Sequence, residues 1–285
     1  MEPRLLQIQD DGCKEINIFI HGYNLDKEND LIQYISYIND LELRGKVYIF
    51  FWGSAKVSSN DLVGKIISMI INGLWTTVPL QYKLPAIPVI LYLHFLSESK
   101  DAINLGSNIL RRISKVHYSR KYPINLIGFS LGTEIIKQAL LKNCWERYNI
   151  NNVILLGGAA GNDYNDWQVC KDVIRGKIFN VYSKEDDLLR LVLFEKTIGR
   201  NPIRGRRNKI INKRLNLDHN EYMINLSYIF NKILPNRRRS KKNSSIVYCI
   251  CPYCKEKLNV KPKVKSLCSN CGEGFKYIPA TGKYK

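Results

Sequence analysis

A serine between two glycines is the residue of this chain whose setting most suggests covalent chemistry. Ser130 lies in LIGFSLG, from Leu126 to Gly132, after an apolar run and before a pattern typical of a helix. A sharp strand-to-helix turn exposes a serine hydroxyl and places it at the positive end of the helix. The order INLIGFSLGTEIIKQALL therefore predicts a nucleophile at Ser130, with a purely structural turn as the alternative.

A serine hydroxyl needs a base, which in turns of this kind follows the nucleophile along the chain, after an acid. The chain has four histidines, and His219 is the one that lies beyond Ser130. It stands in LNLDHNEYM, between an extended segment and an amphipathic pattern. We therefore predict His219 as the base, and we expect His21, which precedes the serine, to be a structural residue of its loop.

The third member of such a triad is a carboxylate at the end of a later strand, where it orients the imidazole. The stretch KIFNVYSKEDDLL ends a predicted strand in Glu185, Asp186 and Asp187. At most one of them is the acid, and spacing alone does not separate Asp186 from Asp187.

Two backbone amides are needed to hold the oxyanion that develops during acyl transfer. The amide of Leu131 follows the nucleophile directly, and the loop FIHGYN places the amide of Tyr23 after an early strand. These two amides are the predicted oxyanion hole.

Cysteines cluster near the C-terminus, where five of the eight in the chain occur. Cys251 and Cys254 form one C-x-x-C pair, and Cys268 and Cys271 form a second pair after thirteen intervening residues. Four thiolates at this spacing predict a structural Zn²⁺ of the zinc-ribbon type, with no coordination position left for a catalytic water. Cys249 is then a spare thiol.

The chain as a whole alternates short aliphatic runs with helical patterns, which is typical of an α/β fold with a mostly parallel sheet and helices on both faces. The predicted strands are Ile16–Ile20, Val47–Phe51, Ile124–Phe129, Asn152–Gly157 and Lys177–Tyr182. The predicted helices lie within residues 27–43, 102–118, 132–148 and 219–234.

Composition predicts three parts: an α/β domain over residues 1–235, a basic linker over 236–245 and a zinc ribbon over 246–285. An apolar insertion at about 60–97 interrupts the first part, and three prolines divide its stretch from Leu62 to Leu96. This insertion is a cap over the sheet, a lid that enters a bilayer interface, or a membrane span.

The formal net charge of +19 favours polyanionic partners such as nucleic acid, anionic lipid headgroups or phosphorylated substrates. Residues 196–214 carry eight cations and no acid, and they form either a solvated loop or a docking surface for an anionic membrane or substrate. The lysines of the ribbon favour nucleic acid or a protein partner. No cationic and apolar leader opens the chain, so we expect it in the cytoplasm or peripheral to a membrane.

The motifs YPINLIGFSLGTEII, INNVILLGGAA, IRGKIFNVYSKEDDLL and LDHNEYM, in that order, resemble an α/β-hydrolase family. This family includes the eukaryotic transmembrane and coiled-coil domain-containing protein four and is catalogued as a domain of unknown function. The resemblance implies a serine hydrolase fold, frequent membrane association and an acid at Asp186. Asp187 stands where the family has an aromatic residue, and Asp218 replaces a glycine before His219, whereas Tyr222 fits the family pattern.

The expected activity is therefore hydrolysis of an ester, with a lipid or phospholipid as the expected substrate, through an acyl-enzyme. Two alternatives share the same residues. One is a thioesterase or peptidase, and the other is a non-catalytic protein of hydrolase fold that the ribbon targets to nucleic acid or protein.

Overall fold

The computed structural model describes residues 4–22, 28–52, 104, 122–142, 148–193, 196–205, 209–235 and the backbone of five short strands within 247–284. The apolar insertion, the basic linker, Tyr23, the predicted helix at 102–118 except residue 104, and all four predicted zinc ligands lie outside the described residues.

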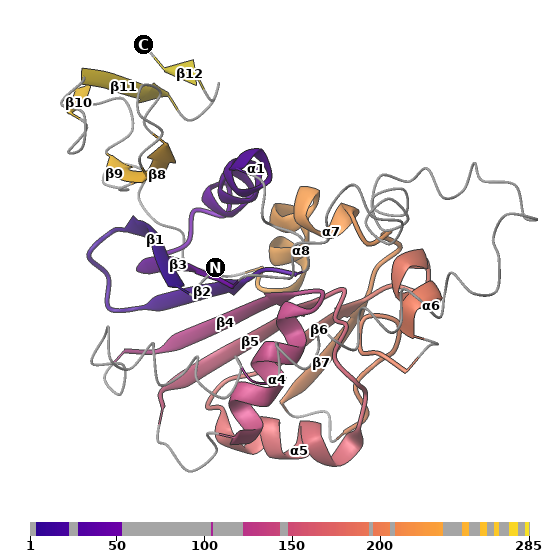
Figure 1. Ribbon diagram of the computed structural model, residues 1–285. Helices are drawn as coiled ribbons and strands as arrows, with labels where there is room; N and C mark the ends of the chain where they lie inside the picture. The colour runs from indigo at the N-terminus through magenta and orange to yellow at the C-terminus, as the bar shows by residue number, and fades with distance from the viewer. Residues whose placement is uncertain are drawn as a thin grey trace, which may run out of the picture.

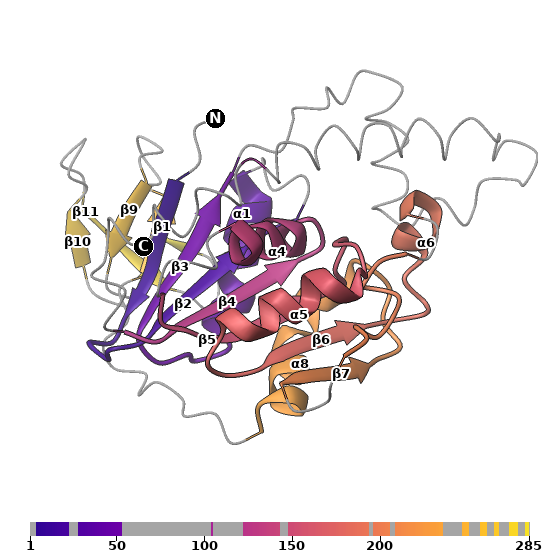
Figure 2. The same ribbon diagram turned by 90° about the horizontal axis from the view of Figure 1, so that it is seen from below.

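A seven-stranded sheet forms the centre of the described chain, with strand order β1-β3-β2-β4-β5-β6-β7 (Figures 1 and 2). Strand β1 is antiparallel to β3, and the other neighbouring pairs are parallel. The strands are β1 (Arg4–Asp10), β2 (Ile16–Ile20), β3 (Lys46–Phe51), β4 (Ile124–Phe129), β5 (Ile150–Leu156), β6 (Ile178–Tyr182) and β7 (Ile210–Arg214).

Helices cover both faces of this sheet (Figure 1). Helices α4 (Gly132–Lys142) and α5 (Tyr164–Val173) lie on one face, and α1 (Glu28–Asn39), α7 (Glu221–Ile224) and α8 (Leu226–Ile233) on the other. Helix α6 (Asp187–Leu193) lies at the end of the sheet where the parallel strands terminate. This order of strands, with helices on both faces and one antiparallel edge strand, fits the α/β-hydrolase fold.

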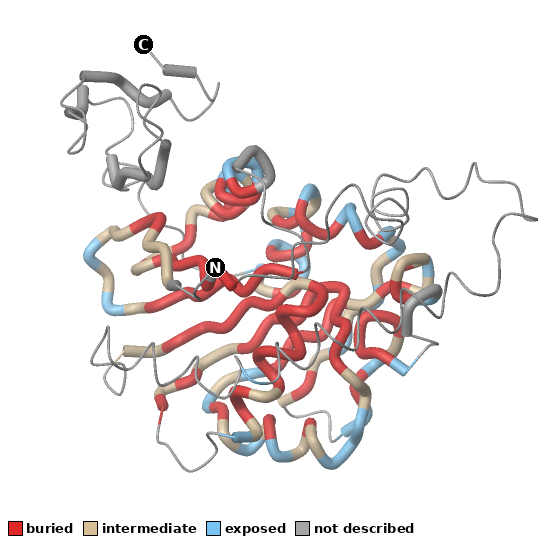
Figure 3. Tube along the Cα trace, in the orientation of Figure 1, coloured by how far each residue is buried: buried red, intermediate tan, exposed pale blue. Residues whose placement is uncertain are grey.

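The core explains why the predicted strands are continuous apolar runs. Along β2, Ile16, Ile18 and Ile20 belong to the cluster that packs under α4 and α5, whereas Phe19 belongs to the cluster under α1 and α8. Successive side chains of a strand point to opposite faces, so a sheet buried on both faces needs an apolar residue at nearly every position. The central strands are accordingly buried along most of their length (Figure 3).

The five predicted strands are confirmed, with boundaries shifted by at most two residues, and the predicted helices at 27–43 and 132–148 are confirmed as the shorter α1 and α4. The single closing helix predicted over 219–234 is wrong, because it divides at Asn225 into α7 and α8. Asn225 has φ −92° and ψ 15°, outside the helical range, and both its backbone amide and its side-chain amide donate to the carbonyl of Glu221 at 2.9 Å. Strands β1 and β7 and helices α5 and α6 are additional elements that were not among the predicted ones.

The C-terminal part contains two separate small sheets. Strands β8 (Val247–Ile250) and β9 (Lys257–Val260) pair antiparallel, and β11 (Gly274–Ile278) pairs antiparallel with both β10 (Lys265–Leu267) and β12 (Lys283–Tyr284). One C-x-x-C pair falls in the connection between β8 and β9, and the second falls between β10 and β11.

No helix among the described residues combines the length and the apolar character needed to cross a bilayer.

Candidate active site

The turn at Ser130 has strained backbone geometry. Ser130 connects β4 to α4 with φ of 51°, in the left-handed region that non-glycine residues rarely occupy. Its amide donates to the carbonyl of Leu156 at 3.0 Å, and its carbonyl accepts from the amide of Ala159 at 3.1 Å and the hydroxyl of Thr133 at 2.7 Å. The backbone on both sides of the strained residue is therefore fixed by hydrogen bonds.

The flanking glycines permit this turn to pack against the end of β2. A Cβ on Gly132 would lie 2.2 Å from the carbonyl oxygen of Ile20, and one on Gly22 would lie 2.7 Å from the Cβ of Ser130. A Cβ on Gly128 would lie 2.7 Å from Ile136 of α4. The three glycines thus allow the end of β2, the loop after it and α4 to pack around Ser130 more closely than any residue with a side chain would permit.

The structure brings Ser130, His219 and Asp186 together in one hydrogen-bonded row. Nε2 of His219 lies 2.9 Å from Oγ of Ser130, and Nδ1 lies 2.8 Å from Oδ2 of Asp186. An ionised carboxylate only accepts, so Nδ1–H donates to Asp186 and the lone pair of Nε2 faces the serine hydroxyl. The three side chains come from the turns after β4, β6 and β7, where parallel strands end at the same edge of the sheet.

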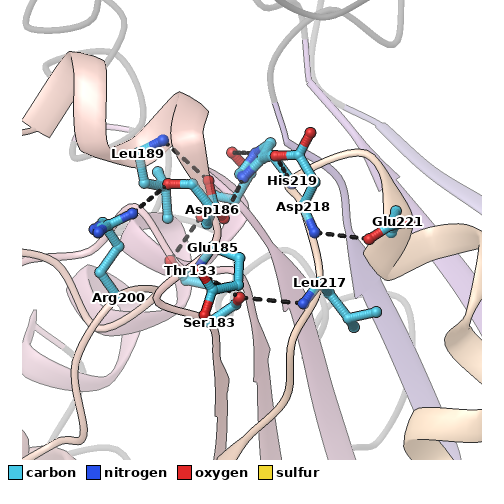
Figure 4. A network of polar contacts seen from close by, with 11 residues as sticks. Thr133, Ser183, Glu185, Asp186, Leu189, Arg200, Leu217, Asp218, His219 and Glu221 are labelled. Atoms are coloured by element: carbon cyan, nitrogen blue, oxygen red, sulfur yellow. Dashed lines mark hydrogen bonds and ion pairs between the residues drawn. The ribbon is translucent and has the colours of Figure 1, made fainter. Parts of the chain in front are cut away.

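Geometry separates Asp186 from Asp187, which spacing could not do. Asp186 is fully buried, with Oδ2 bonded to His219 and Oδ1 accepting the amide of Leu189 in the first turn of α6 (Figure 4). Asp187 has an exposed side chain that pairs with Arg190 at 3.1 Å. The first aspartate is the N-terminal cap of α6, and capping turns its carboxylate inward, whereas the second begins the helix and faces solvent.

A hydroxyl ties the loop that carries the acid to the loop that carries the histidine. Oγ of Ser183 accepts the amide of Glu185 at 3.0 Å and the amide of Leu217 at 3.1 Å (Figure 4). On the far side of His219, the amide of Asp218 donates to Glu221 at 2.8 Å. These bonds fix the approach of His219 to Asp186 without contacting the reacting atoms.

Arg200 reaches the same loop from the basic stretch. Its side chain is buried, at 4% exposure, and Nη1 donates to the backbone carbonyl of Asp186 at 2.6 Å. We expected this stretch to be either a solvated loop or a docking surface, and for Arg200 both expectations are wrong. Lys209 also belongs to the fold, because its ammonium donates to the carbonyl of Ile174 at 2.7 Å.

The ring of Tyr222 packs against the ring of His219. In the sequence, only the family resemblance pointed to Tyr222. Its ring lies edge-on to His219, with centroids 6.4 Å apart, and close against Gly157. The side chain is fully buried, and its hydroxyl has no hydrogen-bond partner among the described residues. Burial, with the charge of Asp186 as a smaller cause, raises the pKa of Tyr222 well above its usual value.

His21 is held as a neutral structural residue near the serine loop. Nδ1–H donates to the carbonyl of Gly22 at 2.6 Å, and Nε2 accepts the amide of Trp52 at 3.3 Å. Burial lowers the pKa of His21 to about 4, with the two backbone hydrogen bonds opposing the shift. Of the predicted oxyanion hole, Leu131 is buried directly after the serine, and Tyr23 lies outside the described residues.

Among the residues whose side chains the structure describes, no group of three or more His, Cys, Asp or Glu is arranged to hold a metal ion. The predicted ligands Cys251, Cys254, Cys268 and Cys271 fall outside them, so the zinc site stays a prediction.

A family model described as "Protein of unknown function (DUF726)" matches residues 66–233 of the chain, which is more than half of its length. The chain belongs to this family. The match includes Ser130, Asp186 and His219, so the described triad lies within the region that the family shares.

Individual relatives are long proteins that the chain matches in part. An uncharacterized membrane protein of Caenorhabditis elegans is 31% identical over 138 residues, which is 45% of this chain and 21% of that protein. A transmembrane and coiled-coil domain-containing protein of Oryza sativa is 33% identical over 70 residues, 24% of this chain and 11% of that protein. The matched segments therefore span about a fifth or less of these relatives.

Among solved structures, a lipase-esterase related protein from Clostridium acetobutylicum is similar to this chain. The TM-score is 0.45 at 11% sequence identity, with 83% of this chain and 99% of that chain covered.

Proposed function

We propose that the protein is a serine hydrolase that cleaves esters through an acyl-enzyme. The observation that carries this proposal is the unbroken row from Oγ of Ser130 through His219 to Asp186, at 2.9 and 2.8 Å. A strained serine, a correctly oriented imidazole and a buried carboxylate are the parts that nucleophilic acyl transfer requires. Hydrogen bonds that served only to stabilise the fold could form without a left-handed backbone at Ser130 and without the close-packed glycines around it.

In the proposed mechanism, Oγ of Ser130 attacks the ester carbonyl carbon while its proton passes to Nε2 of His219. Asp186 holds the ring in the required tautomer and stabilises the imidazolium. The imidazolium then donates that proton to the departing alcohol, and water hydrolyses the acyl-serine with the same histidine as base. The amide of Leu131, at the start of α4, is one proposed donor to the oxyanion, and the amide of Tyr23 is the other.

The test is covalent labelling with a fluorophosphonate, which reacts with activated serines. We expect the full chain to be labelled and Ser130→Ala to be unlabelled. Ser36→Ala, which changes an exposed serine of α1, is the matched control and should label like the wild type. Absence of labelling at Ser130 with and without added lipid would support a non-catalytic protein of hydrolase fold instead.

For the substrate, we propose a lipid ester. The support is the net charge of +19 and the printed names of the relatives, which call them membrane proteins. A panel of acylglycerols, phospholipids, acyl thioesters and peptides, each assayed with wild type and Ser130→Ala, separates this class from a thioesterase or a peptidase.

We also propose that the C-terminal part is a zinc ribbon with Zn²⁺ bound by Cys251, Cys254, Cys268 and Cys271. The support is that each cysteine pair falls between two strands that pair antiparallel, which is where a ribbon places its ligands. A role for this part in binding nucleic acid or protein stays a prediction. Metal analysis of the purified chain should find one zinc, lost in Cys251→Ser/Cys254→Ser and retained in Cys249→Ser.

A further inference from the structure

An open surface pocket of about 660 Å³ lies beside the start of α5, at the edge of the sheet where the parallel strands end. Its walls are the loop Gly161–Tyr164 and, from the basic stretch, Lys196, Asn201, Pro202 and Arg204. We refer to it as the basic cavity. Its volume is in the range of cavities that hold small organic ligands.

Two of its cations are not used by the fold. Lys196 and Arg204 are exposed, and within the described part of the chain neither side chain has a carboxylate or other polar partner. Other cations of the same stretch are engaged, as Arg200 binds the carbonyl of Asp186 and Arg214 lies 3.4 Å from Glu185. Among the described cations of the stretch, Arg200 and Lys209 therefore hold the structure, whereas Lys196 and Arg204 line the cavity.

The walls of the basic cavity are held by backbone and amide hydrogen bonds. The segments 158–162 and 196–199 form a short ladder, with Gly199 N to Gly158 O at 2.7 Å and Asn162 N to Lys196 O at 3.1 Å. The side chain of Asn162 donates to the carbonyl of Pro202 at 3.0 Å. A cavity that is shaped before a ligand arrives loses less entropy on binding.

One carboxylate, that of Asp163, also lines the cavity. Its Oδ1 accepts the amide of Asp166 at 3.0 Å, so it serves as the N-cap of α5. Two cations, one engaged carboxylate and the positive end of a ten-residue helix leave an environment that favours an anion. An arginine fork with a lysine point charge suits the oxygens of phosphate.

The wall of the basic cavity begins close in space to the turn at Ser130. The amide of Ala159 donates to the carbonyl of Ser130 at 3.1 Å, and Gly161, two residues further on, is the first residue of the cavity wall. An extended chain advances at most about 3.5 Å per residue, so the wall begins within roughly 10 Å of the turn. A molecule with an ester carbonyl at Ser130 and a phosphate several bonds away would reach both.

We propose that the basic cavity binds a phosphate group and that, if the proposed ester hydrolysis is correct, this phosphate belongs to the substrate. The substrate class is then a phosphate-bearing ester. The binding claim is independent of catalysis, and the substrate claim rests on the proposed function.

The binding claim is tested with inorganic phosphate titrated by calorimetry into the full chain carrying Ser130→Ala. Adding Lys196→Gln/Arg204→Gln should weaken binding by roughly tenfold or more, because two charge-assisted contacts are lost. The control pair Lys142→Gln/Arg175→Gln removes the same charge from exposed positions outside the cavity and should leave binding unchanged. Equal weakening by both pairs would overturn the site, because it would show an effect of net charge alone.

Asp163→Asn gives a test in the opposite direction. Asparagine is also a good N-cap, so α5 keeps its start while the carboxylate charge next to the ligand is removed. Phosphate binding should tighten, by roughly fivefold if the charges are about 4 Å apart in water. Unchanged or weaker binding in Asp163→Asn would contradict a phosphate in this cavity.

The substrate claim is tested with Ser130 intact, comparing lysophosphatidic acid with an uncharged monoacylglycerol of the same acyl chain. Lys196→Gln/Arg204→Gln should raise KM for the phosphate-bearing ester and leave kcat/KM for the uncharged ester unchanged. Phosphate binding with no preference for the phosphate-bearing ester would assign the cavity to free phosphate and overturn the substrate claim. Phosphate binding without turnover of any ester would overturn the proposed function and leave the site in place.

Discussion

The hydroxyl oxygen of Ser183 accepts the backbone amide of Leu217 at 3.1 Å, across 34 positions of the chain. This bond joins the turn that carries Asp186 to the turn that carries His219. The distance between acid and base in the triad therefore depends on a residue that touches neither the nucleophile nor a substrate.

Replacing Ser183 with alanine should leave two amides, those of Glu185 and Leu217, without their acceptor. We expect a loss of about 1 kcal/mol in the free energy of unfolding, because both hydrogen bonds are only partly buried. Labelling of Ser130 should slow because the acid and base turns are no longer tied. Urea unfolding and labelling rates measure both effects, and an unchanged labelling rate in a destabilised variant would show that Ser183 acts on stability alone.

The two neighbouring aspartates should respond differently to the same change. Asp186→Asn removes the acceptor that selects the histidine tautomer, and a loss of about 10⁴ in kcat is the scale known for such a change. Asp187→Asn alters an exposed residue paired with Arg190 and should keep activity within about twofold of wild type. Ester turnover with the best substrate of the panel measures both. Equal losses in the two variants would mean that the acid is misassigned.

Gly132 should be intolerant of a side chain. Gly132→Ala places a Cβ 2.2 Å from the carbonyl oxygen of Ile20, which is backbone and cannot rotate away. We expect a loss of about 3 kcal/mol in the free energy of unfolding, the upper end for overpacked sites. Gly161→Ala is the control, since its Cβ would meet only the end of the Lys137 side chain at 3.7 Å. Thermal or urea unfolding of both variants decides the comparison.

Removing the hydroxyl of Tyr222 should not destabilise the protein. The hydroxyl is buried and has no hydrogen-bond partner among the described residues, so Tyr222→Phe removes a desolvated polar group and keeps the ring that packs on Gly157. Stability should stay level or rise by about 1 kcal/mol. Tyr222→Ala, which also removes the ring, should cost about 3–5 kcal/mol. A marked loss of stability in Tyr222→Phe would reveal a partner for this hydroxyl.

His21 should make stability depend on pH. Burial lowers its pKa in the folded chain from 6.5 to about 4, so the unfolded chain binds a proton between these values while the folded chain does not. The contribution of the neutral His21 is complete above pH 6.5 and is lost as pH falls toward 4, by roughly 3 kcal/mol in total. Urea unfolding of wild type and His21→Gln measures it. The stability difference between them should shrink from pH 7 to pH 4, and a constant difference would contradict the prediction.

Much of this architecture could be predicted from the sequence because the sheet is mostly parallel and buried on both faces. Continuous apolar runs such as Ile16–Ile20 mark central strands, and a serine between glycines after such a run marks the turn. Strand β1 was missed because it is an edge strand that mixes polar and apolar residues, RLLQIQD, and pairs antiparallel with a strand far along the chain.

The candidate site was harder to complete from sequence alone. Ser130 stands out because glycines flank it after an apolar run. His219 stands out because it is the one histidine that follows Ser130 in the chain. Asp186 and Asp187 are adjacent, and which one turns inward depends on where α6 begins. Arg200 was indistinguishable from the other cations of its stretch, because its burial depends on a turn between β6 and β7 that composition does not reveal.

The bond between Ser130 and His219 joins residues 89 positions apart, and the bond between His219 and Asp186 joins residues 33 apart. Contacts of such separation form late in folding, since the loop entropy must be overcome before they contribute. The three side chains therefore meet only when β4, β5, β6 and β7 have come together in the sheet. We therefore expect fluorophosphonate labelling of Ser130 to report on completion of the sheet, with partly folded chains left unlabelled.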